Sequence, residues 1–462
     1  MLLFFIIIYL IITVAIGFLA SGQVKNAEDF ILAGRRLPLI LSTSALFATW
    51  FGSETVLGAS SEFIKHGLYG VIEDPFGASL CLLLVAVFFA RPLYRMNILT
   101  FGDFYRVKFN RNTEIISSFF MVPSYFGWIA AQLVALGIIL NVISGFPVWQ
   151  GIVLSAILVS AYTFLGGLWA ISVTDFLQTI IIIVGLAILA FTMVSEVGGL
   201  DMVIDKAPEG FFKFLPEPDP TEILYYFAAW ITIGLGSIPQ QDVFQRVMSA
   251  RSEKVAVRSS YIASAMYLTV AFLPLLIALC SRILFPELME GDEQIILPQV
   301  VLLHTNLGVQ VLFFGALISA IMSTTSAAIL APASILAENL VKPLLRNNMD
   351  KKQHLLLLRM SVIFIAFLST ILATYSTNIY HLVGESSALS LVSLFVPMVA
   401  GLYWKKATST GAILSMVFGL GTWILFEYIQ VDIPSLIPAL IVSAVLMFLG
   451  SIFIKIPGSE SS

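Results

Sequence analysis

The chain has 462 residues, of which 59% are hydrophobic and 11% are charged, with a formal net charge of −4. A soluble domain carries about 25% charged residues, because its surface must be polar. This composition excludes a water-soluble globular protein, so we expect the lipid bilayer to be the solvent and expect no nucleic-acid partner.

The first apolar stretch covers residues 2–20 and has no basic residue before it. Lys25, Arg35 and Arg36 follow it. A signal peptide has the opposite order of charge and a shorter apolar core. We therefore predict a first transmembrane helix that is retained, with its N-terminus outside.

Twelve further segments are long and apolar enough to cross a bilayer, which takes about 20 mostly apolar residues. The thirteen predicted spans cover residues 2–20, 39–63, 71–93, 115–144, 151–170, 172–194, 222–238, 256–284, 300–333, 355–375, 379–403, 411–428 and 435–454. The longest polar connections, 196–221 and 286–299, are too short for a soluble domain. We predict one all-α integral membrane domain over residues 1–462.

The basic residues predict the orientation of these spans. All but four of the 24 lysines and arginines follow odd-numbered spans, and the four exceptions are Lys65, Lys206, Lys213 and Arg282. Because loops rich in lysine and arginine stay on the cytoplasmic side, the odd-numbered ends are predicted to be cytoplasmic. The chain would lie in the cell membrane with its N-terminus outside and its C-terminus inside.

Two spans are interrupted at their centres. The second contains TWFGSET around Gly52, and the seventh contains GLGSIPQQD around Pro239. Glycine and proline in mid-span leave backbone groups without partners, which is tolerated only next to protein, a cavity or a ligand. Two interrupted helices in corresponding positions of two repeats indicate a substrate and ion site at the midplane. Spans 2–6 and 7–11 would form such inverted repeats, and two ordinary kinks are the alternative.

Three polar features lie within or next to spans. The run SAIMSTTS at 319–326 offers hydroxyls that suit Na⁺, although serine and threonine also bond the preceding turn or a neighbouring helix. Asp175 lies between spans 5 and 6 and is either a functional carboxylate or a solvated one at a wet helix end. Glu54 lies deeper within its span, which favours a functional role.

Other charged and aromatic residues allow two interpretations. Glu62, Glu73 and Asp74 are expected near the outer face, where water can solvate them. Trp50 and Trp128 lie within spans rather than in the interfacial belt. A mid-span tryptophan usually packs, but two of them can also wall a solute or offer a cation–π face.

Several stretches carry a family resemblance in consistent order between about residues 25 and 405. They are ATWFGSE, YTFLGGLWAISVTDFLQ, GSIPQQDVFQRVMSA and ALISAIMSTTSAAILAPAS. These stretches resemble the sodium:solute symporters and, within that family, the high-affinity choline transporters. The resemblance implies the leucine-transporter-type fold of two inverted five-helix repeats, with one helix before and two after, and alternating access driven by Na⁺.

The resemblance also implies ion ligands. The sodium site would use three main-chain carbonyls and two hydroxyls, from Ala48, Phe51, Ala320, Ser323 and Thr324. A second ion or proton site in some members combines the aspartate matching Asp175 with a serine pair one turn further along span 9. That pair is Ala327 and Ala328 in this chain, which puts the second ion in doubt.

The implied solute site departs from the choline transporters. Trp50 and Trp128 match two tryptophans of an aromatic cage, but the third position is Gln240 and a matching tyrosine position is Ala78. Two aromatic walls with an amide can hold a cation or suit a neutral polar solute. With Glu54 beside them, Trp50, Trp128 and Gln240 are the predicted substrate-binding residues.

Together these features predict a Na⁺-coupled secondary active symporter that imports a small organic solute, either choline-like or another polar solute. A channel or a substrate-sensing receptor on the same fold is the alternative. An intramembrane enzyme is disfavoured, because no H-E-x-x-H or P-loop motif occurs and the four histidines are scattered near span ends.

Overall fold

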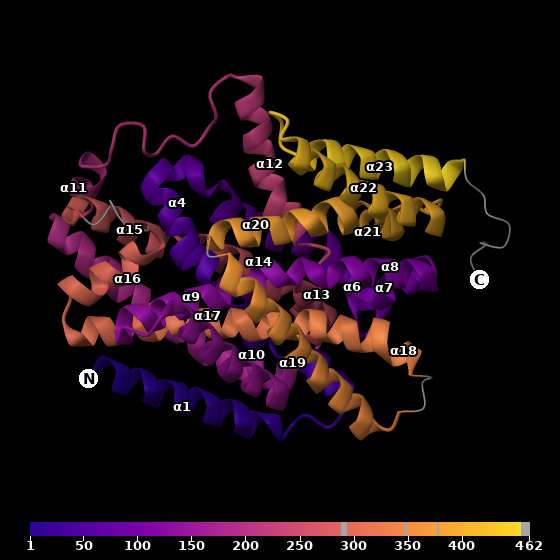
Figure 1. Ribbon diagram of the computed structural model, residues 1–462, viewed down its shortest axis with the longest axis horizontal. Helices are drawn as coiled ribbons and strands as arrows, with labels where there is room; N and C mark the ends of the chain where they lie inside the picture. The colour runs from indigo at the N-terminus through magenta and orange to yellow at the C-terminus, as the bar shows by residue number, and fades with distance from the viewer. Residues whose placement is uncertain (288–292, 346–348, 377, 454–462) are drawn as a thin grey trace.

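The computed structural model describes residues 1–287, 293–345, 349–376 and 378–453. Within these ranges every regular element is a helix, and the one extended pairing is an isolated bridge between Leu37 and Ala250. Most helices lie side by side with their long axes in one direction, and α12 crosses them (Figure 1).

The helix bounds follow the chain. The α-helices are α1 (Leu2–Ser21), α2 (Ala27–Leu32), α3 (Leu39–Trp50), α4 (Ala59–His66), α5 (Ala78–Leu84), α6 (Ala90–Met96), α7 (Phe101–Lys108), α8 (Arg111–Met121), α9 (Phe126–Ser144), α10 (Val148–Val197), α11 (Leu200–Asp205), α12 (Pro220–Gly236), α13 (Gln241–Ser249), α14 (Glu253–Val270), α15 (Phe272–Leu284), α16 (Glu293–His304), α17 (Leu307–Ile335), α18 (Lys342–Leu344), α19 (Lys351–Tyr375), α20 (Ile379–Ser390), α21 (Val396–Tyr403), α22 (Ser409–Ile429) and α23 (Leu436–Ile452). Short π or 3₁₀ segments are η1 (Ala33–Arg35), η2 (Glu54–Gly58), η3 (Gly67–Val71), η4 (Ile72–Gly77), η5 (Val85–Phe89), η6 (Pro123–Tyr125), η8 (Leu336–Val341) and η9 (Leu391–Phe395).

Eight continuous helical stretches in the described ranges are long and apolar enough to cross a membrane, or nine if the bent pair α12 and α13 counts as one. The stretch α10 alone has 50 residues, and it contains the predicted spans 151–170 and 172–194. A straight helix of that length would measure about 75 Å, more than twice the hydrocarbon thickness. Gly167 breaks it with φ 50° and ψ −156°, next to the predicted boundary.

One predicted boundary is wrong. The ninth span was expected from residue 300, but residues up to His304 belong to the separate helix α16, and α17 begins at Leu307. The separation has a local cause, because the Asn306 side chain accepts a hydrogen bond from Val309 N and caps α17. The connections expected at 196–221 and 286–299 likewise contain α11 and part of α16.

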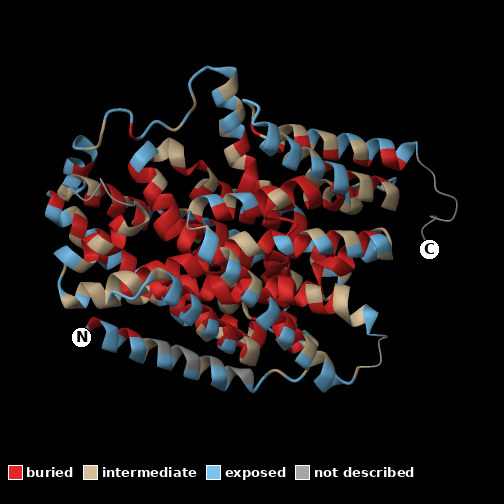
Figure 2. Ribbon diagram, viewed as in Figure 1, coloured by how far each residue is buried: buried red, intermediate tan, exposed pale blue. Residues whose placement is uncertain are grey.

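Large apolar side chains face outward from many helices. Leu19, Phe119, Phe191 and Phe367 are each more than 60% exposed, and pale exposed positions follow the outer faces of the bundle in Figure 2. Soluble proteins rarely expose such surfaces, whereas lipid tails solvate them. The chain is therefore a multi-pass membrane protein.

The helix α17 occupies the centre of the bundle. Every residue from Ala316 to Ile335 is buried, and Figure 2 shows the buried residues gathered in the middle of the molecule. Polar groups in such a position lie far from water and must find partners inside the protein. The hydroxyl run of α17 is therefore placed where a buried site can form.

Both predicted interruptions are present. The helix α3 ends at Trp50, and Phe51 leaves helical geometry with φ −81° and ψ 75° before the chain turns into η2. The helices α12 and α13 meet at a bend of 47° around Pro239. Each break frees backbone groups inside the bundle, and the two breaks frame the candidate site.

Candidate functional site

The first break frees a carbonyl beside the hydroxyl run. Gly52 N bonds Trp50 O at 3.0 Å, so it does not take the usual helical partner four residues back, Ala48 O. Ala48 O instead accepts hydrogen bonds from Ser323 Oγ at 3.2 Å and Thr324 Oγ1 at 3.1 Å. We call Ala48, Ser323, Thr324 and Asp175, described next, the hydroxyl cluster.

Asp175 joins this cluster. It is fully buried, its Oδ1 accepts a hydrogen bond from Ser323 Oγ, and its Oδ2 has no hydrogen-bond partner among the residues that the structure describes. The alternative of a solvated position at a wet helix end is therefore wrong. A buried carboxylate oxygen without a partner, beside two hydroxyls and a freed carbonyl, is a donor set that fits Na⁺.

The other two expected ligands lie on the same elements. Phe51 follows the end of α3 and Ala320 lies one turn before Thr324 on α17, and both are buried. The positions expected to carry a serine pair, Ala327 and Ala328, are buried alanines without side-chain oxygens. Asp175 therefore contacts the hydroxyl pair of Ser323 and Thr324, and it does so through Ser323.

The four predicted substrate-binding residues line one cavity, which we call the central cavity. Trp50, Glu54, Trp128 and Gln240 all face it, and Ala78 stands at its wall. The space open to the centre of a water molecule is only about 20 Å³, room for about one water. The cavity is thus too small for an organic molecule, and its walls must separate to admit one.

Glu54 is held rigidly in this cavity. Trp128 Nε1 donates to Glu54 Oε1 at 3.0 Å, and Gln132 Nε2 donates to Glu54 Oε2 at 2.6 Å. The Gln132 carbonyl oxygen accepts in turn from Ser53 N at 2.9 Å, in the broken part of span 2. The same bonds that orient the carboxylate therefore fix the Trp128 ring.

Asp74 is a site residue that sequence reasoning missed. It is 1% exposed and faces the central cavity, so its expected solvation near the outer face is wrong. Tyr267 OH donates to one carboxylate oxygen and Thr55 Oγ1 to the other, each at 2.8 Å. Glu62 and Glu73 are partly exposed. The sequence did contain one signal of a buried polar partner, because the hydroxyl of Tyr267 lies in the middle of a span and needs one.

A third carboxylate fixes the other tryptophan. Asp242, at the start of α13, accepts hydrogen bonds from Trp50 Nε1 at 2.7 Å and from Tyr125 OH at 2.6 Å. The Gln240 amide nitrogen donates to Ser390 Oγ at 3.2 Å. The walls of the central cavity are therefore tied to η6, α13 and α20 through buried polar bonds.

The hydroxyl cluster and the central cavity are neighbours across Gly52. A methyl group at Gly52 would lie 2.7 Å from Thr324 Oγ1 and from Gln132 Oε1, and 2.8 Å from Glu54 Oε2. These distances are shorter than real contacts of a methyl carbon, so only glycine fits. A change of geometry in the hydroxyl cluster would therefore directly alter the geometry of the central cavity, and the reverse also holds.

The electrostatics of the two places differ. Arg246 is fully buried on α13 and interacts electrostatically with both Asp175 and Asp242. The residues that line the central cavity in the described ranges include two carboxylates, Glu54 and Asp74, and no lysine, arginine or histidine. The cavity therefore holds two acidic groups, and a positively charged ligand would favour their ionised forms.

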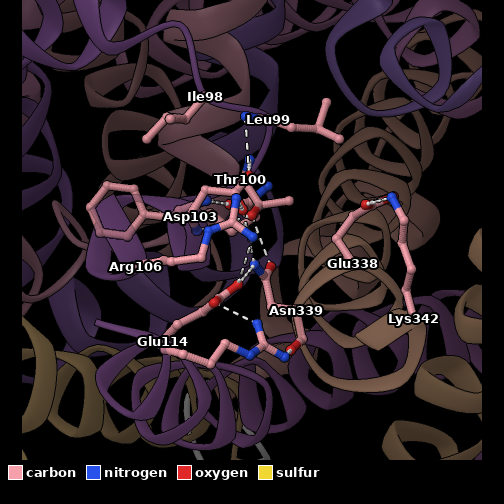
Figure 3. Close-up of polar contacts among 12 residues, drawn as sticks. Ile98, Leu99, Thr100, Asp103, Arg106, Glu114, Glu338, Asn339 and Lys342 are labelled. Carbon is pink, nitrogen blue, oxygen red and sulfur yellow. Dashed lines mark hydrogen bonds and ion pairs between the residues drawn. The ribbon is translucent and has the colours of Figure 1, made fainter. Parts of the chain in front are cut away.

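A polar network that the sequence analysis did not anticipate links α7, α8 and η8. Glu114 is fully buried, is paired with Arg111 and accepts from Asn339 Nδ2 at 2.7 Å. Asn339 Oδ1 accepts from Thr100 Oγ1 at 2.8 Å, and Asp103 caps the same turn by accepting from Thr100 N. Figure 3 shows these groups converging between α7, α8 and η8.

Comparison with known proteins agrees with this architecture. The model of the sodium:solute symporter family matches residues 30–419. The chain is similar to the high affinity choline transporter 1 of Homo sapiens, with 27% identity over 90% of this chain and 75% of that protein. It is also similar to the corresponding Drosophila melanogaster transporter, with 28% identity over 89% of this chain and 68% of that protein. The sodium/glucose cotransporter of Vibrio parahaemolyticus is similar too, with 23% identity over 92% of this chain and 85% of that protein.

Solved structures show the fold. A Na⁺-coupled sialic acid symporter in a substrate-bound outward-open state superposes with a TM-score of 0.85 at 18% identity, covering 98% of each chain. Mhp1, a nucleobase-cation-symport-1 family transporter in a closed conformation, gives 0.56 at 17% identity, covering 91% of this chain and 94% of that one. The fold is that of the leucine-transporter-type symporters.

Proposed function

We propose, from the premise that the chain belongs to the sodium:solute symporter family and moves a small solute together with Na⁺, that its solute is a small organic cation. The observation that carries the proposal is the pair Glu54 and Asp74 in a cavity with no basic lining residue in the described part of the chain. An ammonium group would favour the ionised form of both carboxyl groups, whereas an anionic solute would oppose their ionisation.

The aromatic walls support the same solute class. Trp50, Trp128 and Tyr267 all line the central cavity, and a desolvated aromatic face contributes roughly 2 kcal/mol to binding a cation. Gln240 and Ala78 leave the cage more open than in the choline transporters that the sequence resembles. The proposed solute is therefore a choline-like ammonium compound, and the cage would leave additional room on one side of it.

The proposed Na⁺ site combines the hydroxyl cluster with two more carbonyls. Ser323 and Thr324 hydroxyls and the carbonyls of Ala48, Phe51 and Ala320 would coordinate the ion. Ser323 Oγ bonds both Ala48 O and Asp175 Oδ1, so Asp175 would add its charge to this one site rather than form a separate one. We infer a single Na⁺ as the coupling ion.

The finer architecture belongs to the same proposal. We infer thirteen spans in one domain over residues 1–462, with spans 2–6 and 7–11 as inverted repeats. The support is the break after α3 and the bend between α12 and α13, one in the first span of each repeat. The positive-inside pattern supports an N-terminus outside the cell membrane and a cytoplasmic C-terminus.

Charge movement distinguishes a cationic solute from a neutral one. One Na⁺ entering down a tenfold gradient contributes ~1.4 kcal/mol, and an inside-negative potential of 100 mV contributes ~2.3 kcal/mol per charge. With a neutral solute the total supports roughly 500-fold accumulation, and with a monovalent cation roughly 10⁴-fold. Two charges would enter with each cationic solute molecule.

The test is uptake into Na⁺-free proteoliposomes. We expect saturable, Na⁺-dependent and electrogenic uptake of choline, and no competition from 3,3-dimethyl-1-butanol, its neutral isostere. Replacement of external Na⁺ by K⁺ should stop uptake. Equal uptake in K⁺, or flux without accumulation, would contradict symport and favour a channel, and binding without flux would favour a sensor. Competition by the neutral isostere would contradict the cationic solute class.

A further inference from the structure

The side chain of Arg246 is completely buried and has donors to spare. It lies on α13 and has no exposed surface. Its Nη1 donates to Gln245 Oε1 at 3.4 Å, whereas Nε and Nη2 have no hydrogen-bond partner in the part of the chain that the structure describes. A guanidinium carries five N–H donors, and buried donors normally find acceptors. Arg246 is therefore able to bind a further partner.

Two buried carboxylates lie within electrostatic reach of this guanidinium, Asp175 and Asp242. Asp175 has one oxygen, Oδ2, without a hydrogen-bond partner among the described residues. Asp242 lies on α13 four residues before Arg246, a spacing that places both on one face of the helix. In the described ranges no nitrogen of Arg246 is hydrogen-bonded to either carboxylate. The guanidinium is therefore shared between the two and bound to neither.

The two carboxylates belong to different sites. Asp175 is part of the hydroxyl cluster through its bond with Ser323. Asp242 accepts hydrogen bonds from Trp50 Nε1 and Tyr125 OH, and Trp50 lines the central cavity. Because a carboxylate has about four acceptor positions, Asp242 can accept a bond from Arg246 as well. One positive charge thus stands between the proposed ion site and the proposed solute site.

The charges of these three groups make the position of the guanidinium sensitive to an ion. With all three groups ionised, Asp175, Asp242 and Arg246 carry one net negative charge, which one Na⁺ would neutralise. Na⁺ beside Asp175 would repel the guanidinium and would take over the balance of that carboxylate. The attraction of Asp242 for the guanidinium would remain. Binding of Na⁺ therefore favours contact of Arg246 with Asp242.

We propose that Arg246 is the positioning residue that couples the ion site to the solute site. Without Na⁺ its guanidinium pairs with Asp175 Oδ2, and with Na⁺ it pairs with Asp242 and so fixes the carboxylate that holds Trp50. The Trp50 wall of the central cavity is then firm only when the ion is bound. The inference rests on the proposed function for the ion ligands and for the identity of the solute.

The first measurement is isothermal titration of the purified full-length protein with Na⁺, without solute and at constant ionic strength. It is done at about pH 9, where protons compete less for carboxylates. Arg246→Gln should bind Na⁺ at least fivefold more tightly, because a positive charge near the ion is removed. Asp242→Asn should bind Na⁺ at least fivefold more weakly, because the guanidinium is then left to Asp175. Damage to the fold would weaken binding in both variants, so the opposite signs exclude it.

The second measurement separates a moving guanidinium from a static one. In the wild type, Na⁺ should slow hydrogen exchange of residues 241–249 at least threefold, measured by mass spectrometry, because α13 gains the bond between Arg246 and Asp242. This segment contains none of the proposed ion ligands. In Arg246→Gln, Na⁺ should leave the exchange unchanged. Na⁺ should also tighten choline binding about tenfold in the wild type and less than twofold in Arg246→Gln.

Two further variants serve as controls. Lys254→Gln removes an exposed positive charge on the next helix, α14, and should behave like the wild type throughout. Arg246→Lys keeps the charge and should bind Na⁺ within twofold of the wild type, so it tests the role of charge even where Arg246→Gln does not fold.

Three results would overturn the proposal. They are Na⁺ binding that is unchanged or weaker in Arg246→Gln, tighter binding in Arg246→Lys, and a wild-type effect of Na⁺ on the exchange of α13 in Arg246→Gln. Failure of choline to bind the wild type would contradict the proposed function but leave the Na⁺ results standing.

Discussion

Two adjacent hydroxyls on α17 share one acceptor, Ala48 O, and this shared contact makes a clear prediction. Thr324→Ala should raise the Na⁺ concentration for half-maximal uptake about tenfold, because the proposed site would lose a ligand oxygen that contributes about 1–1.5 kcal/mol. Thr325→Ala is the matched control, since its hydroxyl bonds Ile321 O within the helix. The measurement is the Na⁺ dependence of uptake. Equal dependence in both variants would make the hydroxyl run structural.

Single residues also show what the sequence could predict about the site. Trp50, Glu54 and Trp128 were predicted because polar or aromatic groups within apolar spans stand out, and Gln240 because it takes a cage position of the choline transporters; all four line the central cavity. Asp74 was missed because it lies near the start of a predicted span, where a carboxylate is normally solvated. Its burial depends on the partner Tyr267, which is 193 residues away in the chain, and no local pattern encodes that contact.

At the scale of elements, the break after α3 connects the hydroxyl cluster to the central cavity. Gly52→Ala should abolish Na⁺-dependent solute binding, because the added methyl would overlap oxygens of Thr324, Gln132 and Glu54. Gly315→Ala on α17 is the control, as nothing lies within 4 Å of its added carbon. Thermal stabilisation by Na⁺ and choline measures the effect, with gel filtration to confirm folding. Wild-type stabilisation of Gly52→Ala would separate the two sites.

The boundaries of elements could be predicted from the sequence where amino-acid composition determines them. Apolar length predicted the helical stretches, and glycine and proline predicted the interruptions at Gly52 and Pro239. The division between α16 and α17 was missed because both sides are apolar, and a single capping residue, Asn306, decides it. The short helices α2, α7 and α11 were also missed, since helices of this length depend on tertiary packing more than on propensity.

At the scale of the whole molecule, the network around Asn339 links three elements at the predicted cytoplasmic end. Asn339→Ala would leave buried Glu114 and Thr100 with one partner fewer, which costs about 1–3 kcal/mol. We expect faster hydrogen exchange across residues 98–114, measured by mass spectrometry. Asn141→Ala, which removes a bond to Phe146 O in an exposed turn, should leave that segment unchanged. Equal protection in both variants would contradict a closing role for the network.

Gly167 has a consequence for how this gene can vary. Every single-nucleotide missense change of a glycine codon introduces a side chain that begins with a β-carbon. At this position that carbon would lie 2.6 Å from Phe30 O, in a backbone conformation with φ 50° that such residues rarely adopt. Natural selection should therefore remove missense alleles at codon 167 as strictly as at the proposed ion ligands, although Gly167 lies outside the hydroxyl cluster and does not line the central cavity.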